Sequence, residues 1–306
     1  MRLPLLLALL ASPVMAGDLA FVTSQNGNAL SVVDLATGDI AAEVVIPDAP
    51  APVAYDATSG RVHVIAANTG RLHVLDKAGR PLLQADLGEG AFGIATGPDG
   101  ALYVADWFGA RLMRLDRDLQ MVWQVATGPA PAGVAVSADG ALVATADRDA
   151  DAVGIFDAAT GDLLHRVATA GPHPFGITFH DGLIWTADVM GDRVSVIDPV
   201  AGRLVGQIPT GSHPYAVAFA AGRGFVTNQY DGSVTVFDAD SHAVLATVAV
   251  GDYPEGISPL PDGSAVAVAN WDSDTLSILD ATDLTVTMTV DLPSGPRAFG
   301  VFTGPP

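Results

Sequence analysis

The sequence contains no cysteine, which excludes disulfides, lipid attachment through a cysteine, thiolate metal sites and covalent c-type haem. Lysine occurs once, at Lys77, and 34 acidic residues stand against 14 basic ones, giving a formal net charge of −20. This charge repels nucleic acid and anionic membrane surfaces. Its main expected effect is solubility, and steering of a cationic partner is the alternative. The sequence has no run of about twenty apolar residues, so we expect no membrane insertion.

The first sixteen residues, MRLPLLLALLASPVMA, have the composition of a signal peptide. Arg2 is followed by an apolar run, and Val14 and Ala16 occupy the small-residue positions of a cleavage site. We therefore predict that residues 1–16 are a signal peptide and that residues 17–306 form one exported, periplasmic, monomeric domain.

A hydrophobic segment that ends in aspartate recurs along the chain. Successive aspartates are 42, 40, 41, 41, 40 and 42 residues apart. They are Asp34, Asp76, Asp116, Asp157, Asp198, Asp238 and Asp280. Self-similarity of this period is typical of repeat architectures, in which each repeat is one small structural unit.

Each repeat holds four short apolar segments separated by turn residues. FVTSQNGNALSVVD gives two strands joined by a loop, AATGDLLHRVAT a turn and a third strand, and GPHPFGITFHDG a strand between proline and a turn. Four antiparallel strands per repeat predict a β-propeller blade. The chain starts with the second strand of a blade, GDLAFVTSQ, and ends with SGPRAFGVF, which matches its missing first strand. We predict an all-β, seven-bladed β-propeller closed by this C-terminal strand, which completes the first blade.

One part of the repeat carries a family resemblance. Residues 194–238, VSVIDPVAGRLVGQIPTGSHPYAVAFAAGRGFVTNQYDGSVTVFD, resemble the YVTN-repeat β-propellers, with residues 225–228 in place of the tetrapeptide that names the family. The resemblance extends over residues 17–306 and implies a propeller fold and export. It implies no single chemistry, because the repeat is shared by propellers of unknown role, propellers resembling sugar lactonases, amine-dehydrogenase heavy chains and haem d1-binding domains.

Two sets of loops are expected to meet at one end of the central channel: the lead-in loops before the first strand of each blade, and the loops between its second and third strands. Their mixture of aromatic rings, carboxylates, amides, imidazoles and one guanidinium predicts a ligand site there. The lead-in loops supply Phe92, His173, His213, Tyr253, Glu255, Arg297 and Phe299. The other loops supply Asp106, Trp107, Asp188, Asn228, Tyr230, Asn270 and Trp271. The repeated Asn and Asp residues also fit a structural role, as partners of loop backbone groups.

His173 and His213 occupy the same place in neighbouring repeats, GPHPFGITFHDG and GSHPYAVAFAAG. Because neighbouring blades stand side by side around the channel, both imidazoles could contact one ligand. That ligand would be a divalent metal completed by Glu255, or a haem-like cofactor that needs one histidine. Ala130 and Tyr253 fill the same place in other repeats. Histidine is therefore also explained as one tolerated residue at a turn, and the sequence leaves these alternatives open.

Common catalytic and nucleotide-binding motifs are missing, namely Gly-x-Ser-x-Gly, a Gly-Lys-Ser/Thr loop and a glycine-rich dinucleotide fingerprint. We therefore predict a non-catalytic binding or scaffold protein that holds a small molecule, a cofactor or an exported partner protein at the channel mouth. The alternative is a metal-dependent, lactonase-like hydrolase, or a redox or cofactor accessory propeller resembling amine-dehydrogenase heavy chains or haem d1-binding domains. Its acid–base chemistry would fall to carboxylates such as Asp106, Asp188, Glu255 and Asp272, with His173 or His213.

Overall fold

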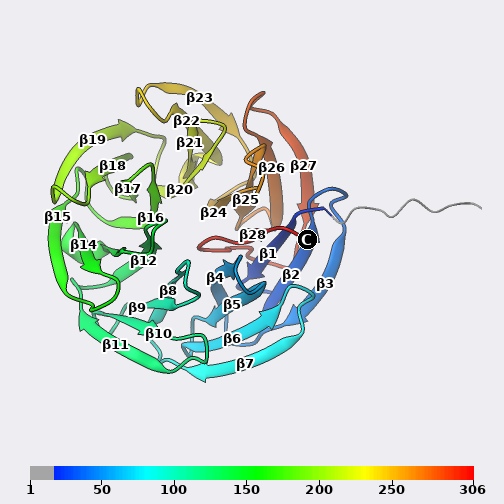
Figure 1. Ribbon diagram of the computed structural model, residues 1–306. Helices are drawn as coiled ribbons and strands as arrows, with labels where there is room; N and C mark the ends of the chain where they lie inside the picture. Colours follow the sequence, from blue (N-terminus) through cyan, green and yellow to red (C-terminus); the bar gives the residue numbers. More distant parts are fainter. Residues whose placement is uncertain (1–16) are drawn as a thin grey trace, which may run out of the picture.

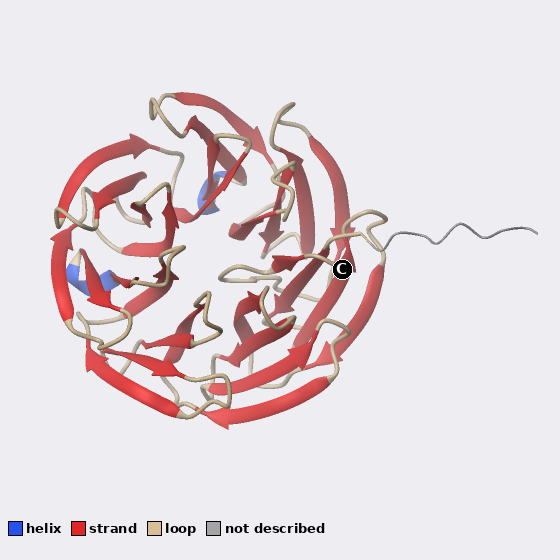
Figure 2. Cartoon of the chain, viewed as in Figure 1, coloured by secondary structure: helices blue, strands red, loops and turns tan. Residues whose placement is uncertain are grey.

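A computed structural model describes residues 17–306, and the predicted signal peptide, residues 1–16, lies outside the described residues. The described chain forms a ring of seven four-stranded antiparallel sheets around a central channel (Figure 1). This confirms the all-β, seven-bladed propeller. Among residues 17–306 the only helical turns are two short 3-10 helices, η1 (Arg148–Ala150) and η2 (Gln229–Asp231), each between the second and third strands of a blade (Figure 2).

The blades follow one another around the ring in chain order. Blade 1 consists of β1 (Leu19–Ser24), β2 (Ala29–Asp34), β3 (Ile40–Val45) and the closing strand β28 (Thr303–Gly304). Blade 2 consists of β4 (Pro50–Asp56), β5 (Arg61–Ala66), β6 (Arg71–Asp76) and β7 (Pro81–Asp86). Blade 3 consists of β8 (Ala91–Thr96), β9 (Leu102–Asp106), β10 (Arg111–Leu115) and β11 (Met121–Ala126). Blade 4 consists of β12 (Pro131–Val136), β13 (Leu142–Asp147), β14 (Ala152–Asp157) and β15 (Leu163–Ala168). Blade 5 consists of β16 (Pro174–His180), β17 (Leu183–Asp188), β18 (Arg193–Asp198) and β19 (Arg203–Pro209). Blade 6 consists of β20 (Pro214–Ala220), β21 (Arg223–Asn228), β22 (Ser233–Asp238) and β23 (Val244–Ala249). Blade 7 consists of β24 (Pro254–Pro259), β25 (Ala265–Asn270), β26 (Thr275–Asp280) and β27 (Val286–Asp291).

The core lies between the blades. Because each blade is covered on both faces by its neighbours, inner strands such as β5 are buried along almost their whole length, whereas outer strands such as β7 are exposed. The ring of Trp185 in blade 5, for example, packs against Phe219 and Phe237 of blade 6, with centroids 5.0 and 5.7 Å apart. Burial of such a side chain stabilises the fold by about 2–3 kcal/mol.

The recurring aspartates lie at the end of the third strand of each blade, or directly after it in the case of Asp116, and stabilise the turn that follows. Oδ1 of Asp157, for example, accepts the backbone N–H groups of Ala159 and Thr160, both at 2.9 Å. These hydrogen bonds lower the pKa of Asp157 below its ordinary range. A short carboxylate at this position therefore stabilises the tight turn that leads to the outer strand. This explains why aspartate recurs about every 41 residues in the sequence.

The C-terminal segment closes the ring as predicted, but less regularly than a strand over 294–302 would. Only Thr303 and Gly304 form a strand, β28, paired with β1. The middle of the segment moves over to β4, where Val53 donates its N–H to the carbonyl oxygen of Phe299 at 3.0 Å. Gly300 permits this departure, because its φ of 130° is open only to glycine and a Cβ there would lie 2.2 Å from the Val53 oxygen. The segment, red in Figure 1, thus reaches into the centre of the ring.

Deleting residues 294–306 should open blade 1. The deletion removes the buried side chains of Ala298, Phe299 and Phe302 and exposes β1, so we expect the free energy of unfolding to fall by more than about 4 kcal/mol. Chemical denaturation followed by circular dichroism measures this. Deletion of Pro305 and Pro306 alone, both exposed, is the control and should change stability little. An unchanged midpoint after the longer deletion would contradict closure by this segment.

Candidate functional site

The residue before the first-strand proline adopts the same left-handed backbone conformation in five blades. Its φ is 59° at His173, 54° at His213 and 57° at Tyr253, and alanine holds 62° and 51° at Ala49 and Ala130. The carbonyl oxygens of His173 and His213 each accept a backbone N–H from the loop between the second and third strands, at 3.0 Å. Because alanine suffices for this turn in two blades, the turn itself does not require the imidazole rings.

The side chain of His213 belongs to a row of planar groups on the face formed by the two sets of loops, which we call the loop face. Its ring stacks on Tyr230, with centroids 3.8 Å and planes 19° apart, and its Nδ1 lies 2.9 Å from Ser212 Oγ. The row continues from Tyr230 to Tyr253 at 5.5 Å and from Tyr253 to Trp271 at 5.8 Å. We call His213, Tyr230, Tyr253 and Trp271 the aromatic strip.

Glu255, the third member of the metal set suggested by the sequence, is engaged elsewhere. Its carboxylate is buried, and Oε2 lies 2.6 Å from Arg297 Nε while Oε1 accepts a hydrogen bond from Gln229 Nε2 at 2.7 Å. Burial raises the pKa of Glu255, although Arg297 and Gln229 act in the opposite direction. Within residues 17–306 no three His, Asp or Glu side chains are grouped closely enough to hold a metal ion. His173, His213 and Glu255 in this arrangement do not fit a metal centre.

Arg297 contacts side chains of four blades and therefore lies near the axis of the ring. It donates hydrogen bonds to Gln25 of blade 1 at 3.0 Å and to the Tyr215 hydroxyl of blade 6, and it pairs with Glu255 of blade 7. Its guanidinium also lies over the ring of Phe92 in blade 3, 5.6 Å from the centroid. Burial alone would lower the pKa of Arg297, but Tyr215 and Glu255 outweigh burial and raise it, so the group stays cationic.

Four aromatic rings lie beside Arg297 and cross the channel. Phe299 lies 5.0 Å from Phe175 and 5.5 Å from Phe92, and Phe175 lies 4.3 Å from Tyr215, between ring centroids. Phe175, Tyr215 and Phe299 are each at most 7% exposed. We call Phe92, Phe175, Tyr215 and Phe299 the aromatic layer. It separates the part of the channel near the loop face from the remainder.

A pocket of about 220 Å³ opens on the loop-face side of the aromatic layer. Four aromatic residues form its walls, Phe92, Trp107, Phe108 and Phe175. Arg297 contributes to its lining, and Glu89 also borders it. Arg148 lies over the Trp107 ring, 5.6 Å from its centroid. We call this cavity the loop-face pocket. Of the residues that the sequence proposed for the site, it brings together Trp107, Arg297 and Phe92.

The repeated Asp and Asn residues face the interior of the blades. Asp188 Oδ2 accepts the N–H of Gly171 at 2.9 Å, and Asn228 Oδ1 accepts that of Gly211 at 3.1 Å. Each therefore fixes its lead-in loop to the second strand of the same blade. The same place is buried in blades 3 and 7, where Asp106 and Asn270 stand. Asp106 Oδ1 accepts the N–H of Gly109 at 2.7 Å, whereas Asn270 Nδ2 donates to the hydroxyl groups of Thr275 and Ser277 in β26. None of these four side chains lines the loop-face pocket.

Asp188 is a buried carboxylate whose pKa is strongly raised. Its side chain is fully buried, Oδ2 accepts bonds from Gly171 and Ser195, and Oδ1 has no hydrogen-bond partner among the described residues. Burial raises the pKa of Asp188 to about 7, while Ser195, Gly171 and Arg193 act in the opposite direction. The neighbouring blade places the neutral Asn228 at this position.

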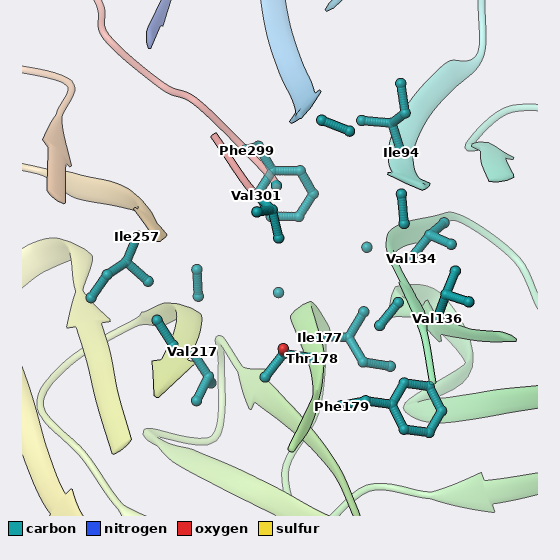
Figure 3. Close-up of a pocket in the computed structure, with 18 of the residues that line it drawn as sticks. Ile94, Val134, Val136, Ile177, Thr178, Phe179, Val217, Ile257, Phe299 and Val301 are labelled. Carbon is teal, nitrogen blue, oxygen red and sulfur yellow. The ribbon is translucent and has the colours of Figure 1, made fainter. Parts of the chain in front are cut away.

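A larger cavity of about 360 Å³ lies on the other side of the aromatic layer, toward the far face of the ring. The second halves of the first strands of blades 2 to 7, together with Phe299, Gly300 and Val301, line it. The side chains labelled in Figure 3 surround one common space: Ile94, Val134, Val136, Ile177, Thr178, Phe179, Val217, Ile257, Phe299 and Val301. We call it the axial cavity. Except for Phe299, sequence reasoning missed these residues, since small apolar residues of an inner strand have the same pattern whether they face the core or the channel.

Comparison with known proteins gives fold relatives. A family model described as outer membrane protein assembly factor BamB matches residues 48–174, less than half of the chain. No curated protein sequence matches. A functionally unknown protein from Desulfotomaculum acetoxidans DSM 771 has a similar structure, with a TM-score of 0.81 and 15% identity over 95% of this chain and 100% of its own.

Two other solved structures are similar. Kuenenia stuttgartiensis hydrazine synthase has a TM-score of 0.72 and 16% identity, covering 81% of this chain and 88% of its own. Dihydro-heme d1 dehydrogenase NirN in complex with DHE has a TM-score of 0.70 and 14% identity, covering 97% of this chain and 78% of its own. At these identities the similarity concerns the fold. Among residues 17–306, no helix has the length and apolar character needed to cross a membrane.

Replacing Asp188 by Asn should stabilise the protein in a pH-dependent way. The folded-state pKa of about 7 lies above the ordinary 3.8, so ionisation of Asp188 costs stability increasingly from about pH 4 until it is complete above pH 7. Asp188→Asn removes this cost, and we expect it to gain about 2–4 kcal/mol at pH 8 and little at pH 4. Urea denaturation at both pH values measures the difference. Asp283→Asn, at an exposed turn, should show no such gain; equal effects of the two changes would contradict a buried, strained carboxylate.

Proposed function

We propose that the protein is an exported, non-catalytic binding protein, whose loop-face pocket holds a flat apolar group of a small molecule or of a partner protein. The observation that supports this most directly is the pocket itself, with aromatic walls from Phe92, Trp107 and Phe175. Ligand sites are usually built in this way, from apolar and aromatic walls with few polar groups. A cavity of about 150 Å³ is known to hold benzene, so 220 Å³ suits one aromatic ring and its substituents.

The charges around the pocket favour a neutral group. The Arg297 guanidinium is paired with Glu255 at 2.6 Å, so it offers little net charge to an anion. Glu89 on the border of the pocket adds a negative charge, and the whole chain carries −20. The side of a ligand or partner that enters the pocket is therefore aromatic and uncharged, and a surrounding basic surface on a partner would favour association.

Three of the candidate carboxylates, Asp106, Asp188 and Glu255, are buried among protein groups, which supports a binding role and not acid–base catalysis. Asp106 is buried and accepts a hydrogen bond from Arg111 Nε at 2.7 Å. Asp188 holds the Gly171 loop, and Glu255 is paired with Arg297. A general acid or base must reach the reacting group of its substrate, and these three carboxylates face protein groups instead.

The alternative of a cofactor or metal propeller fits the residues less well. NirN, a fold relative, is described as a dihydro-heme d1 dehydrogenase. A haem-like group in this protein would need an axial histidine. Neither His173 nor His213 lines the loop-face pocket, and the His213 ring is stacked on Tyr230. These donors do not fit a cofactor seated on the aromatic walls.

Export is proposed from residues 1–16, whose composition is that of a signal peptide, and from the resemblance of residues 194–238 to YVTN-repeat propellers. On this view residues 17–306 are the mature, single-domain protein. The mass of the protein recovered from the periplasm would show cleavage before Gly17.

Titration with N-acetyltryptophanamide, a neutral mimic of a partner's aromatic side chain, tests the pocket. We expect saturable binding that Trp107→Ala weakens at least about fivefold, because one aromatic wall is lost. The double variant His173→Ala, His213→Ala is the matched control and should bind as the unchanged protein does. Loss of binding in the double variant with normal binding in Trp107→Ala would place the ligand on the aromatic strip. A visible chromophore or stoichiometric metal that disappears in the double variant would favour the cofactor alternative.

A further inference from the structure

The axial cavity is a blind pocket that opens toward the far face. Along β16, Pro174, Phe175 and Gly176 are buried, and the last four residues, Ile177 to His180, are partly exposed. Val301, at the same end of the cavity, is 56% exposed. At the inner end Phe299, which belongs to the aromatic layer, is 5% exposed. Solvent therefore reaches the cavity from the far face, and the aromatic layer closes its inner end.

The lining combines apolar side chains with the inner edges of first strands. The cavity is bordered by apolar side chains from five different blades, namely Ile94, Val134, Ile177, Val217 and Ile257. In blades 3 to 7 the first strand has no sheet neighbour on its channel side, so backbone N–H and C=O groups also border the cavity. None of the described residues that line it is Asp, Glu, Lys or Arg. Such a lining suits an uncharged molecule, because a buried unpaired charge is strongly unfavourable.

We propose that the axial cavity is a second binding site, which takes a neutral ligand of about two fused rings with one hydrogen-bonding group. The size follows from the volume: about 360 Å³ is somewhat more than twice the roughly 150 Å³ that holds benzene in an apolar protein cavity. This volume also falls within the range of small-molecule sites, from about 300 to 1,000 Å³. The site is independent of the loop-face pocket, from which the aromatic layer separates it.

The polar end of the ligand lies at the outer end of the cavity. Thr178 contributes the hydroxyl group visible in Figure 3, and the His180 ring, stacked on Phe219 with centroids 3.8 Å apart, borders the same end. Asp181 Oδ2 lies 3.4 Å from His180 Nε2. A carboxylate on the ligand would meet this negative charge. A hydroxyl or carbonyl group bonds to Thr178 or His180 without that repulsion, so the hydrogen-bonding group is a neutral one.

Isothermal titration of the mature protein with 2-naphthol tests the site. We expect one saturable site, with 2-naphthoate bound at least about tenfold more weakly because of its charge. Thr178→Val, which removes the hydroxyl and keeps the shape, should reduce the preference for 2-naphthol over naphthalene by about fivefold. Val217→Phe fills the cavity and should weaken 2-naphthol at least about tenfold.

Two further variants keep this test decisive. Val301→Trp covers the opening from an exposed position, so it should fold even if Val217→Phe does not, and it should also weaken binding at least about tenfold. Val205→Phe, on the exposed outer strand β19, is the matched control and should bind as the unchanged protein does. Absence of saturable binding, or equal affinity in Val301→Trp, would overturn the proposal. Binding lost in Trp107→Ala but kept in the cavity variants would also overturn it, and would instead support the loop-face pocket.

Discussion

Closure of the ring by residues 294–304 is the constraint on which both halves of the channel depend. The segment is hydrogen-bonded to β1 near its ends and to β4 in its middle, so it bends inward and brings Arg297 and Phe299 to the centre. A cation in that position must be neutralised, because loss of one partner from a buried ion pair costs about 3–5 kcal/mol. Glu255 neutralises it from blade 7. Ring closure, the ion pair and the aromatic layer therefore form one connected unit.

This unit gives the two ends of the channel different properties. The loop face carries the aromatic strip and a small pocket with aromatic walls that Glu89 borders. The far-face side has a larger cavity whose lining lacks acidic and basic side chains other than histidine. One propeller can thus hold one group on each face without the two meeting, since the aromatic layer lies between them. The loop face suits a partner or a single ring, and the axial cavity suits a larger neutral molecule.

The repeat made most of the fold predictable. The aspartates that include Asp157 recur because each holds the same turn, and this period gives seven blades without any knowledge of contacts. The detail of closure was not predictable, because the departure at Gly300 depends on the carbonyl of Val53 in another blade. For the candidate site, the positions of Trp107 and Arg297 within the sequence repeat were enough to predict that both lie at the loop face. The pairing of Arg297 with Glu255 depends on which blades meet near the axis, and no local pattern encodes it. The axial cavity was missed because Ile177 and Val217 have the same pattern as core residues of a strand.

A crystal structure under xenon pressure would test most directly whether the aromatic layer divides the channel. Xenon enters apolar cavities, and its density is easily distinguished from that of water. We expect xenon in the axial cavity beside Ile177 and Val217, with no ordered water between Phe175, Tyr215 and Phe299. A continuous file of ordered water from the loop face past Phe299 to the far face, with no xenon bound, would contradict a divided channel.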